Sequence, residues 1–244
     1  MNEQQIKYDT GVNILGSIPD FSDVIQYIVL TQQKQKDNNF VFRTSHSTER
    51  FKIAIQSHIM KFANSQHRAY FVKALSSSSF SLSDKFLVLF WQLVYANYLF
   101  RRLTGEVYMH AVYQGRSTIQ SEELISFLHF IKENEKPQDI KWSESTIKII
   151  GSKYLTLLKK LGLAEGAVKK QIRHPMITND LFVWFIRWCQ LVCPDDKSLS
   201  NPYIQFGFMD KETLIQRLKK IENIKYWNIS QIDDEVTIDL KPYE

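Results

Sequence analysis

With 244 residues, 44% of them hydrophobic and 23% charged, the chain can bury a full core and has the composition of an ordinary soluble globular protein. Only eight Gly and six Pro argue against a loop-rich β protein and favour long helices. The formal net charge of +5 suits an anionic partner, and two cysteines are too few for a secreted disulfide framework.

The first half of the chain has apolar residues at helical spacing in segment after segment. Thr104-Gly105 is expected to break the longest of these segments, and the serine tract 76–79 to form a loop. Helices are therefore predicted from Pro19 to the polar tract Gln32–Asn39, from an N-cap at Ser47 to Phe62, over Gln66–Leu75, from Ser83 to Arg102, from Gly105 to about Tyr113, and from Ser121 to Ile131.

Two apolar runs are candidates for a membrane span, and both are too short. Phe86–Phe100 has fifteen residues without a charge, whereas a bilayer span needs about 20. Leu181–Cys193 carries Arg187 near its centre. The polar start of the chain lacks a secretion signal. We expect no transmembrane segment, a cytoplasmic location, and buried free thiols at Cys189 and Cys193.

The charged stretch Lys132–Asp139, which contains Pro137, is the predicted domain boundary. The expected class is mainly α, with an all-helical domain over residues 1–135. Residues 136–244 are expected to form a winged-helix-like domain with short strands and a C-terminal β-hairpin. Its later elements are a helix from the cap Thr178 to Cys193, a short strand with Ile204, Phe206 and Phe208, a helix from the cap Asp210 to about Ile221, and hairpin strands over Tyr226–Ser230 and Val236–Leu240.

Positive charge is concentrated in residues 141–174, which hold eight Lys or Arg against two acids. This segment alone has a net charge of +6, so the rest of the chain sums to −1. Ser143 can cap a helix whose first turn holds Glu144. One face of that helix is apolar, formed by Ile147, Ile150, Tyr154, Leu157, Leu158 and Leu161.

The opposite face of this helix offers hydroxyl and ammonium groups and no acid after Glu144. Gly162 is a predicted C-cap, Gly166 permits a turn, and Val168–Arg173 is a predicted basic strand. This order resembles the recognition helix and wing of a winged-helix domain. The residues predicted to contact DNA are Ser145, Lys148, Ser152, Lys153, Thr156, Lys159, Lys160, Lys169, Lys170 and Arg173.

Because hydroxyls and lysines mostly meet phosphates, and the outer face lacks Arg, Asn and Gln, we expect weak sequence preference on duplex DNA. Neutralising about four to six phosphates would give log K against log salt a slope of about −4 to −5. Three other interpretations stay open. The helix could pack domains together with a lysine-rich back, the region could dock a larger methyltransferase or ATPase, or the helical half could bind RNA through Arg101, Arg102 and Arg116.

The stretch from Trp142-Ser143-Glu144-Ser145-Thr146 to Leu157-Leu158-Lys159-Lys160-Leu161-Gly162-Leu163 is similar to the BrxA family of bacterial BREX phage-defence systems. The order of parts agrees with that family, and the similarity covers about residues 45–195. The resemblance implies a largely helical, non-enzymatic accessory protein that binds double-stranded DNA, with other BREX proteins as further partners.

Sequence motifs for catalysis are missing: there is no phosphate-binding loop, no dinucleotide-binding glycine pattern, no H-E-x-x-H and no G-x-S-x-G. The six histidines lack metal spacing, and His58 and His129 are expected in the core. Asn201-Pro202-Tyr203 and Pro194–Lys197 are interpreted as turns. We therefore predict no enzyme, no catalytic residue, no metal site and no cofactor.

Overall fold

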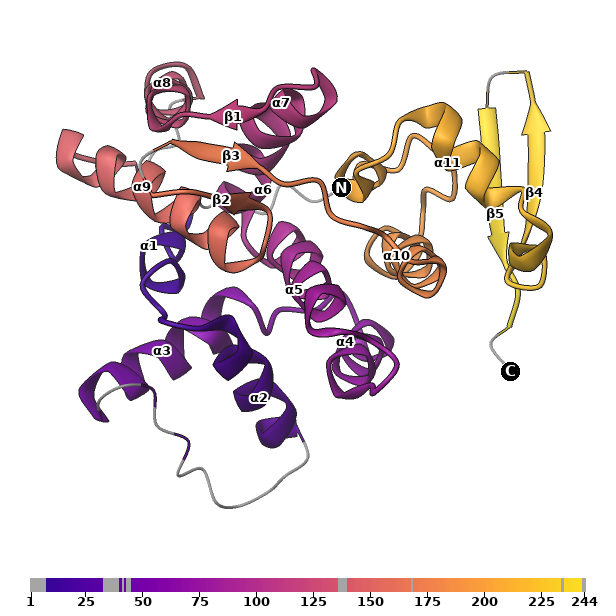
Figure 1. Ribbon diagram of the computed structural model, residues 1–244, viewed down its shortest axis with the longest axis horizontal. Coiled ribbons are helices and arrows are strands. Elements are labelled where there is room, and N and C mark those ends of the chain that lie inside the picture. Colours follow the sequence, from indigo (N-terminus) through magenta and orange to yellow (C-terminus); the bar gives the residue numbers. More distant parts are fainter. Residues whose placement is uncertain are drawn as a thin grey trace. The chain divides into compact units, whose positions relative to one another are not determined.

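The computed structural model describes residues 8–32, 40, 42, 45–135, 140–167, 169–233 and 235–242 (Figure 1). Contacts group the chain into two compact units. The first unit comprises residues 1–62 and 71–175, and the second comprises residues 63–70 and 176–244. The predicted mainly α class with a C-terminal hairpin is confirmed.

Helices form most of the first unit. They are α1 (Val12–Leu15), α2 (Phe21–Gln32), α3 (Ser45–His58), the second half of α4 (Ser65–Ser76), α5 (Leu82–Ala96), α6 (Tyr98–Leu103), the π-helix η1 (Thr104–Met109), α7 (His110–Tyr113), α8 (Ser121–Phe130), the π-turn η2 (Ile131–Glu135) and α9 (Glu144–Lys160). In the described chain no helix is long and apolar enough to cross a membrane.

The apolar run 86–100 is a buried helix, as its length predicted. Residues 87–94 of α5 are all buried, so this helix is covered on every side. Its one amide, Gln92, is wholly buried and donates to the carbonyls of Ile59 and Lys61, each at 2.7 Å. Burial on all faces explains why the run lacks charges without any role for a membrane.

The helix break lies at Asn97 and not at Thr104-Gly105, which corrects the prediction. Asn97 has an extended backbone (ψ 109°) and its side chain caps α6 by accepting from the N–H of Phe100. The chain then stays helical through Gly105 in the π-helix η1, where the hydroxyl of Thr104 is bonded to the carbonyl of Phe100 at 2.6 Å. Asparagine breaks the helix because its side chain replaces a backbone partner.

A three-stranded antiparallel sheet lies beside α8 and α9, in the order β1-β3-β2. The strands are β1 (Thr118–Ile119), β2 (Ala164–Glu165) and β3 (Lys170–Ile172). The register pairs Ile119 with Lys170 and Ala164 with Ile172. Along the chain the order is therefore helix, β1, α8, α9, β2, β3, so the strand after α9 pairs with one that precedes α8.

The second unit contains α10 (Asn179–Val192), the 3₁₀ turn η3 (Ile204–Gly207), α11 (Lys211–Leu218), the 3₁₀ turn η4 (Ile221–Asn223) and the hairpin strands β4 (Trp227–Ile232) and β5 (Glu235–Leu240). The predicted caps Thr178 and Asp210 are confirmed. From the first half of α4, Tyr70 stacks on Trp184 at 5.3 Å. Cys189 and Cys193 are both free, and only Cys189 is fully buried.

The predicted strand at Ile204, Phe206 and Phe208 is wrong, because these residues form a 3₁₀ turn. Phe206 is buried, Gly207 lies against the ring of Phe185, and Phe208 has a left-handed backbone (φ 56°). A pattern of three alternating apolar residues fits both a short strand and a single helical turn. Only the presence of a partner strand decides between the two. Here none of the described strands pairs with the segment.

The predicted boundary after residue 135 stays a prediction. Residues 136–139 lie outside the described chain, and so does Val168 of the predicted basic strand. The contacts, however, place helices from both sides of residue 135 in one unit. Helix α8 packs along α9, and β1 pairs with β3, so this part of the fold combines segments on both sides of the predicted boundary.

Candidate nucleic-acid interface

Helix α9 is built as its sequence predicts. The hydroxyl of Ser143 accepts from the N–H of Thr146 at 3.2 Å and caps the helix. The six residues of the predicted apolar face are each at most 2% exposed. The helix ends before Gly162, whose φ of +74° only glycine adopts without strain. One face of α9 is therefore fixed in the core and the other faces outward.

Two tyrosine hydroxyls fix α9 and the chain after it against the π-helix η1. Tyr154 is wholly buried and its hydroxyl hydrogen-bonds the hydroxyl of Thr104 at 3.1 Å. The hydroxyl of Tyr108 donates to the carbonyl of Leu163 at 3.0 Å, where the chain leaves α9 for β2. Burial raises the pKa of both phenols, so both remain neutral donors.

The predicted contact residues on α9 differ in exposure. Ser145, Lys148, Ser152 and Lys159 are exposed, whereas Lys153, Thr156 and Lys160 are half-buried. In the described chain neither Lys148 nor Lys159 makes a hydrogen bond or an ion pair. The hydroxyl of Thr156 donates to the carbonyl of Ser152 at 2.9 Å, so it satisfies its own helix.

Lys160 is bound by the protein itself. Its Nζ donates to the carbonyl of Gly16 at 2.8 Å and also to the carbonyl of Ile18. Helix α1 approaches α9 closely here, since a Cβ on Gly16 would lie 2.5 Å from the carbonyl oxygen of Lys153. Burial lowers the pKa of Lys160 and the neighbouring Lys153 lowers it further. Most of its donor capacity is therefore used to fasten α1 to α9.

Strand β3 and the residues on either side of it contribute Lys169, Lys170 and Arg173. Lys169 is exposed, but Lys170 is 9% exposed and its Nζ donates to the carbonyls of Gly166 and Ala167. Arg173 is exposed and pairs with Glu165 on the neighbouring strand. Of these three basic side chains, Lys169 is therefore free, Lys170 closes the turn, and Arg173 is already paired with a carboxylate.

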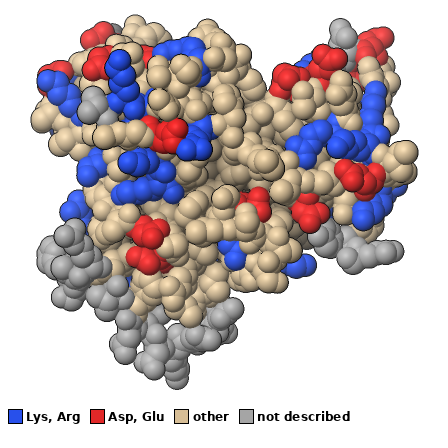
Figure 2. Space-filling model, viewed as in Figure 1, with Lys and Arg blue, Asp and Glu red and all other residues tan. Residues whose placement is uncertain are grey.

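The C-terminal end of α9 lies close to strand β3. Lys170 is close enough to Lys159 that the latter's charge lowers the pKa of Lys170, in addition to the effect of burial. Figure 2 shows lysine and arginine side chains gathered over α9 and the adjoining strands, with acidic groups among them. The end of α9 and strand β3 therefore bring Lys159 and Lys170 close together, and not all of the ten predicted residues offer a free donor.

An exposed isoleucine interrupts the polar face of α9. Ile149 is 48% exposed although it belongs to a helix whose other apolar residues are buried. Helical spacing places it beside Ser145 and Ser152. The sequence carried this signal, because Ile149 falls outside the arc of the six core residues. A partly exposed aliphatic side chain among lysines is a feature that a nucleic-acid contact can use on the thymine methyl group.

The arginines of the helical half are compensated by neighbouring groups. Arg102 pairs with Glu135 at 2.8 Å, and Arg116 binds both carboxylate oxygens of Glu123 at 2.6 and 2.7 Å. The guanidinium of Arg101 lies 5.0 Å from the ring centre of Tyr98. These contacts leave less unpaired positive charge on this surface than the sequence suggested.

Neither His58 nor His129 belongs to the core, which corrects the prediction. His58 lies 2.8 Å from a carboxylate oxygen of Asp9, and His129 lies 3.2 Å from one of Glu144. Among the histidines whose burial the structure describes, His67 is the buried one, and its Nε2 accepts from the indole of Trp188 at 3.1 Å. In the described residues no three His, Cys, Asp or Glu side chains gather closely enough to hold a metal ion.

Comparison with known protein families gives one match, to the family described as BrxA, over residues 32–187. The matched range is well over half of the chain. It includes α9, β2 and β3 and ends inside α10, so the residues after 187, including the hairpin, lie beyond it. A comparison with curated proteins gave no match.

Proposed function

Since this chain belongs to the BrxA family of BREX phage-defence proteins, we propose that it is a non-enzymatic accessory protein that binds duplex DNA through phosphate contacts. One observation carries the proposal. Along the chain the elements follow the order β1, α8, α9, β2, β3, and within the sheet the strands follow the order β1-β3-β2. This arrangement matches that of winged-helix domains, and α9 corresponds in it to the recognition helix. Its outward face has free lysines and is acid-free beyond the first turn.

The DNA contacts centre on the free ammonium groups. Lys148 and Lys159 lie on α9 and Lys169 lies in the wing, and all three are exposed. Lys153 provides a fourth ammonium group, which is half-buried. Lys160 and Lys170 instead donate hydrogen bonds to backbone carbonyls. About four neutralised phosphates give a slope of log K against log salt of about −3.6, slightly shallower than the range of about −4 to −5 that the sequence alone suggested.

The first experiment measures the affinity for a labelled duplex between about 50 and 300 mM salt. Replacing Lys148, Lys159 and Lys169 together with Ala should weaken binding by on the order of 500-fold at 0.1 M salt and flatten the slope by about 3. Because phosphate contacts carry no sequence information, the loss should be equal on unrelated sequences.

The matched control removes the same amount of charge elsewhere. Lys211, Lys220 and Lys225 are exposed lysines of the second unit, and their joint replacement with Ala should leave the affinity within about twofold, because no contact is lost. Equal losses in the two triple variants would show that net charge, and not this surface, governs binding. A salt-independent affinity, or no duplex binding at low salt, would end the proposal.

Structured RNA in the same assay separates the RNA alternative. The pairing of Arg102 and Arg116 with carboxylates favours DNA binding by α9 over RNA binding by the helical half. If RNA competes better than duplex DNA, the lysines of α9 are not the main contact. A larger partner protein that depends on the same three lysines, with DNA affinity absent, would instead support the adaptor interpretation.

A further inference from the structure

The hairpin of the second unit has two edges that differ in their hydrogen bonding. The outer edge of β5 is covered, because the N–H of Leu199 donates to the carbonyl of Val236 at 3.1 Å and the N–H of Ile238 donates to the carbonyl of Lys197 at 2.9 Å. Val236 and Ile238 therefore point their backbone groups away from β4. The segment 197–199 acts as a third strand on this side.

The outer edge of β4 follows from the same register. Ile229 is opposite Ile238 and Gln231 is opposite Val236, so these two residues also point their N–H and C=O groups away from the partner strand. Trp227, two residues earlier, has the same orientation. In the described chain no backbone hydrogen bond reaches these outward groups of Ile229 and Gln231. An edge of this kind is a template for pairing with another strand.

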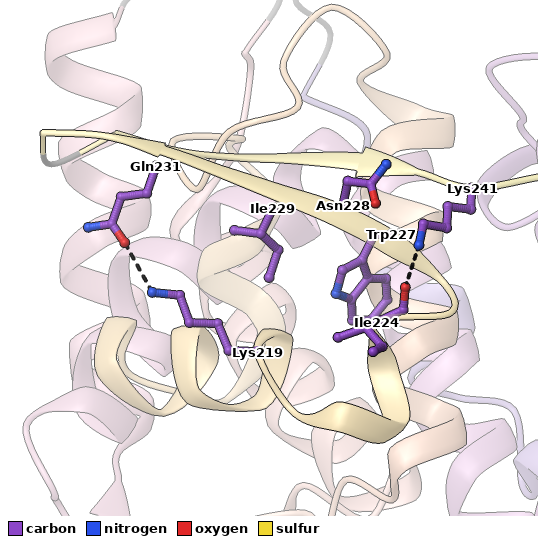
Figure 3. A pocket seen from close by; sticks show the side chains of 7 residues that line it. All are labelled: Lys219, Ile224, Trp227, Asn228, Ile229, Gln231 and Lys241. Carbon is purple, nitrogen blue, oxygen red and sulfur yellow. Dashed lines mark hydrogen bonds between the residues drawn. The ribbon is translucent and has the colours of Figure 1, made fainter.

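A groove of about 450 Å³ lies between one face of β4 and the end of α11, next to the strand whose outer edge is open. Figure 3 shows Trp227, Ile229 and Gln231 pointing from β4 toward Ile224 and Lys219. Its described lining, Lys219, Ile224, Trp227, Asn228, Ile229, Gln231 and Lys241, contains two lysines and no acid. The groove thus combines apolar side chains with two ammonium groups, and the unpaired peptide groups of β4 lie at the adjoining strand edge.

The two ammonium groups are held at fixed positions on the rim. Lys219 Nζ donates to the side-chain carbonyl of Gln231 at 3.1 Å, and Lys241 Nζ donates to the carbonyl of Ile224 at 2.7 Å. Each ammonium has three hydrogens, so both keep donors for a further acceptor. Figure 2 shows lysine and arginine side chains over α11 and the hairpin, with acidic side chains among them.

We propose that the open edge of β4 binds an extended, acidic segment of a partner protein by strand addition. The backbone of that segment pairs with Ile229 and Gln231, and its carboxylates meet Lys219 and Lys241. A second copy of this chain fits poorly, because pairing β4 with itself brings the same lysines together. Duplex DNA fits poorly as well, since it has no peptide groups to pair with the strand edge.

This site is independent of the DNA surface. It lies wholly in the second unit and in residues beyond the family match, whereas the proposed DNA contacts lie on α9 and in the wing. The inference therefore does not rest on DNA binding. A protein that binds DNA with one unit and a segment of a partner protein with the other would connect that partner to DNA.

The experiment uses the full chain and two labelled eight-residue probes, one alternating Glu with Val and one alternating Lys with Val. Fluorescence anisotropy should show saturable binding of the Glu probe and at least about tenfold weaker binding of the Lys probe, because the rim is cationic. Amide resonances of Ile229 and Gln231 should shift on titration more than those of Asn228 and Ser230, whose N–H groups are already paired with β5.

Two pairs of variants test the contacts. Gln231→Pro removes an outward N–H without touching the β4–β5 ladder and should weaken the Glu probe roughly fivefold beyond Gln231→Ala, which keeps that N–H. Lys219→Glu should abolish the preference for the Glu probe. Lys220→Glu, on the adjacent residue outside the groove, should leave it intact. An unchanged melting temperature verifies that each variant is folded.

Three results would overturn the proposal. The first is equal binding of the two probes, which would mean that the rim does not select charge. The second is a probe that shifts amides elsewhere but not those of Ile229 and Gln231. The third is a concentration-dependent dimer that is lost in Gln231→Pro, which would assign the edge to a second copy of the chain.

Discussion

Two lysine-bearing surfaces of this protein, the outward face of α9 and the groove beside β4, differ in what their ammonium groups contact. Lys148 and Lys159 project from a rigid helix and make no described bond. Lys219 and Lys241 are bonded to Gln231 and to a backbone carbonyl across their groove. Free ammonium groups suit the repeated phosphates of a polyanion, whereas fixed ones suit an acceptor at a defined position. The number of charges alone does not distinguish the two surfaces.

The largest expected effect tests whether the two surfaces belong to separable units. Trp227→Ala removes a fully buried indole that donates to the carbonyl of Leu218 at 3.0 Å and packs on Phe182, and it should cost about 3–5 kcal/mol. Thermal unfolding followed by near-ultraviolet circular dichroism should show a destabilised second unit. At 15 °C the Glu probe should no longer bind, while duplex affinity changes little. Loss of duplex affinity as well would show that DNA binding needs the hairpin.

A neighbouring pair on α9 sharpens the contrast between free and bound lysines. Lys159→Ala should lower duplex affinity by roughly eightfold at 0.1 M salt and leave stability nearly unchanged. Lys160→Ala should cost about 1–2 kcal/mol, because it removes the donor that fastens α1 to α9, with a small change in affinity. Chemical denaturation and DNA titration of both variants provide the measurement. If the two variants have the same free energy of unfolding, the hydrogen bonds of Lys160 do not contribute to stability.

A smaller effect concerns the carboxylate that fixes the start of α8 beside the sheet. The hydrogen bonds from Arg116 lower the pKa of Glu123 below 4.5, against the opposing effect of burial. Its stabilisation is therefore present above pH 4.5 and is lost as the pH falls through the lower folded value. Because the pair is about one-third exposed, Glu123→Gln should cost roughly 0.5–1 kcal/mol at pH 7. Urea unfolding should show this difference vanishing once the pH falls below the lowered pKa of the folded state, and a constant difference would refute the assignment.

The smallest expected effect asks whether the α9 surface senses bases at all. Contact between Ile149 and thymine methyl groups would contribute about 0.8 kcal/mol, or roughly fourfold in affinity. Replacing thymine by uracil in an A·T-rich duplex should weaken binding by that factor in the natural chain and not in Ile149→Ala. Variants of the groove beside β4 are the comparison, because they keep Ile149 and should lose the same factor as the natural chain. An identical response of the natural chain and Ile149→Ala would leave phosphates as the sole contact.

Several local signals in the sequence were confirmed, although two helix starts were misplaced: Ser47, predicted as an N-cap, lies inside α3, and α5 is capped by Ser81 and not begun at Ser83. The caps Ser143, Thr178 and Asp210 lie where they were predicted, and Gly162 has the left-handed backbone expected after a helix. Terminal strands β4 and β5 pair as the alternation indicated. The misplaced break at Thr104-Gly105 shows the limit, because the surrounding core keeps that glycine helical while Asn97 ends the helix.

The candidate site was predictable in its composition but not in the state of each side chain. Placing residues at 100° intervals put Lys159 and Lys160 on the same outward half of α9. Only the packing of α1 against α9 explains why the first is free and the second is bound. The sequence likewise separated α8 from α9 at a charged stretch, although strand β3 returns to pair with β1 and unites them.

By itself the sequence determined the amphipathic helix, its caps, the buried apolar helix α5 and the family to which the chain belongs, since periodicity and capping depend on residues within a few turns. The tertiary structure alone decided which ammonium groups remain available, which carboxylates neutralise arginines and which strand edge stays unpaired. Those properties depend on contacts between residues distant along the chain, such as Gly16 with Lys160 or Lys219 with Gln231. Such contacts form only when the helices pack, and no local sequence pattern indicates which distant residue a side chain will contact.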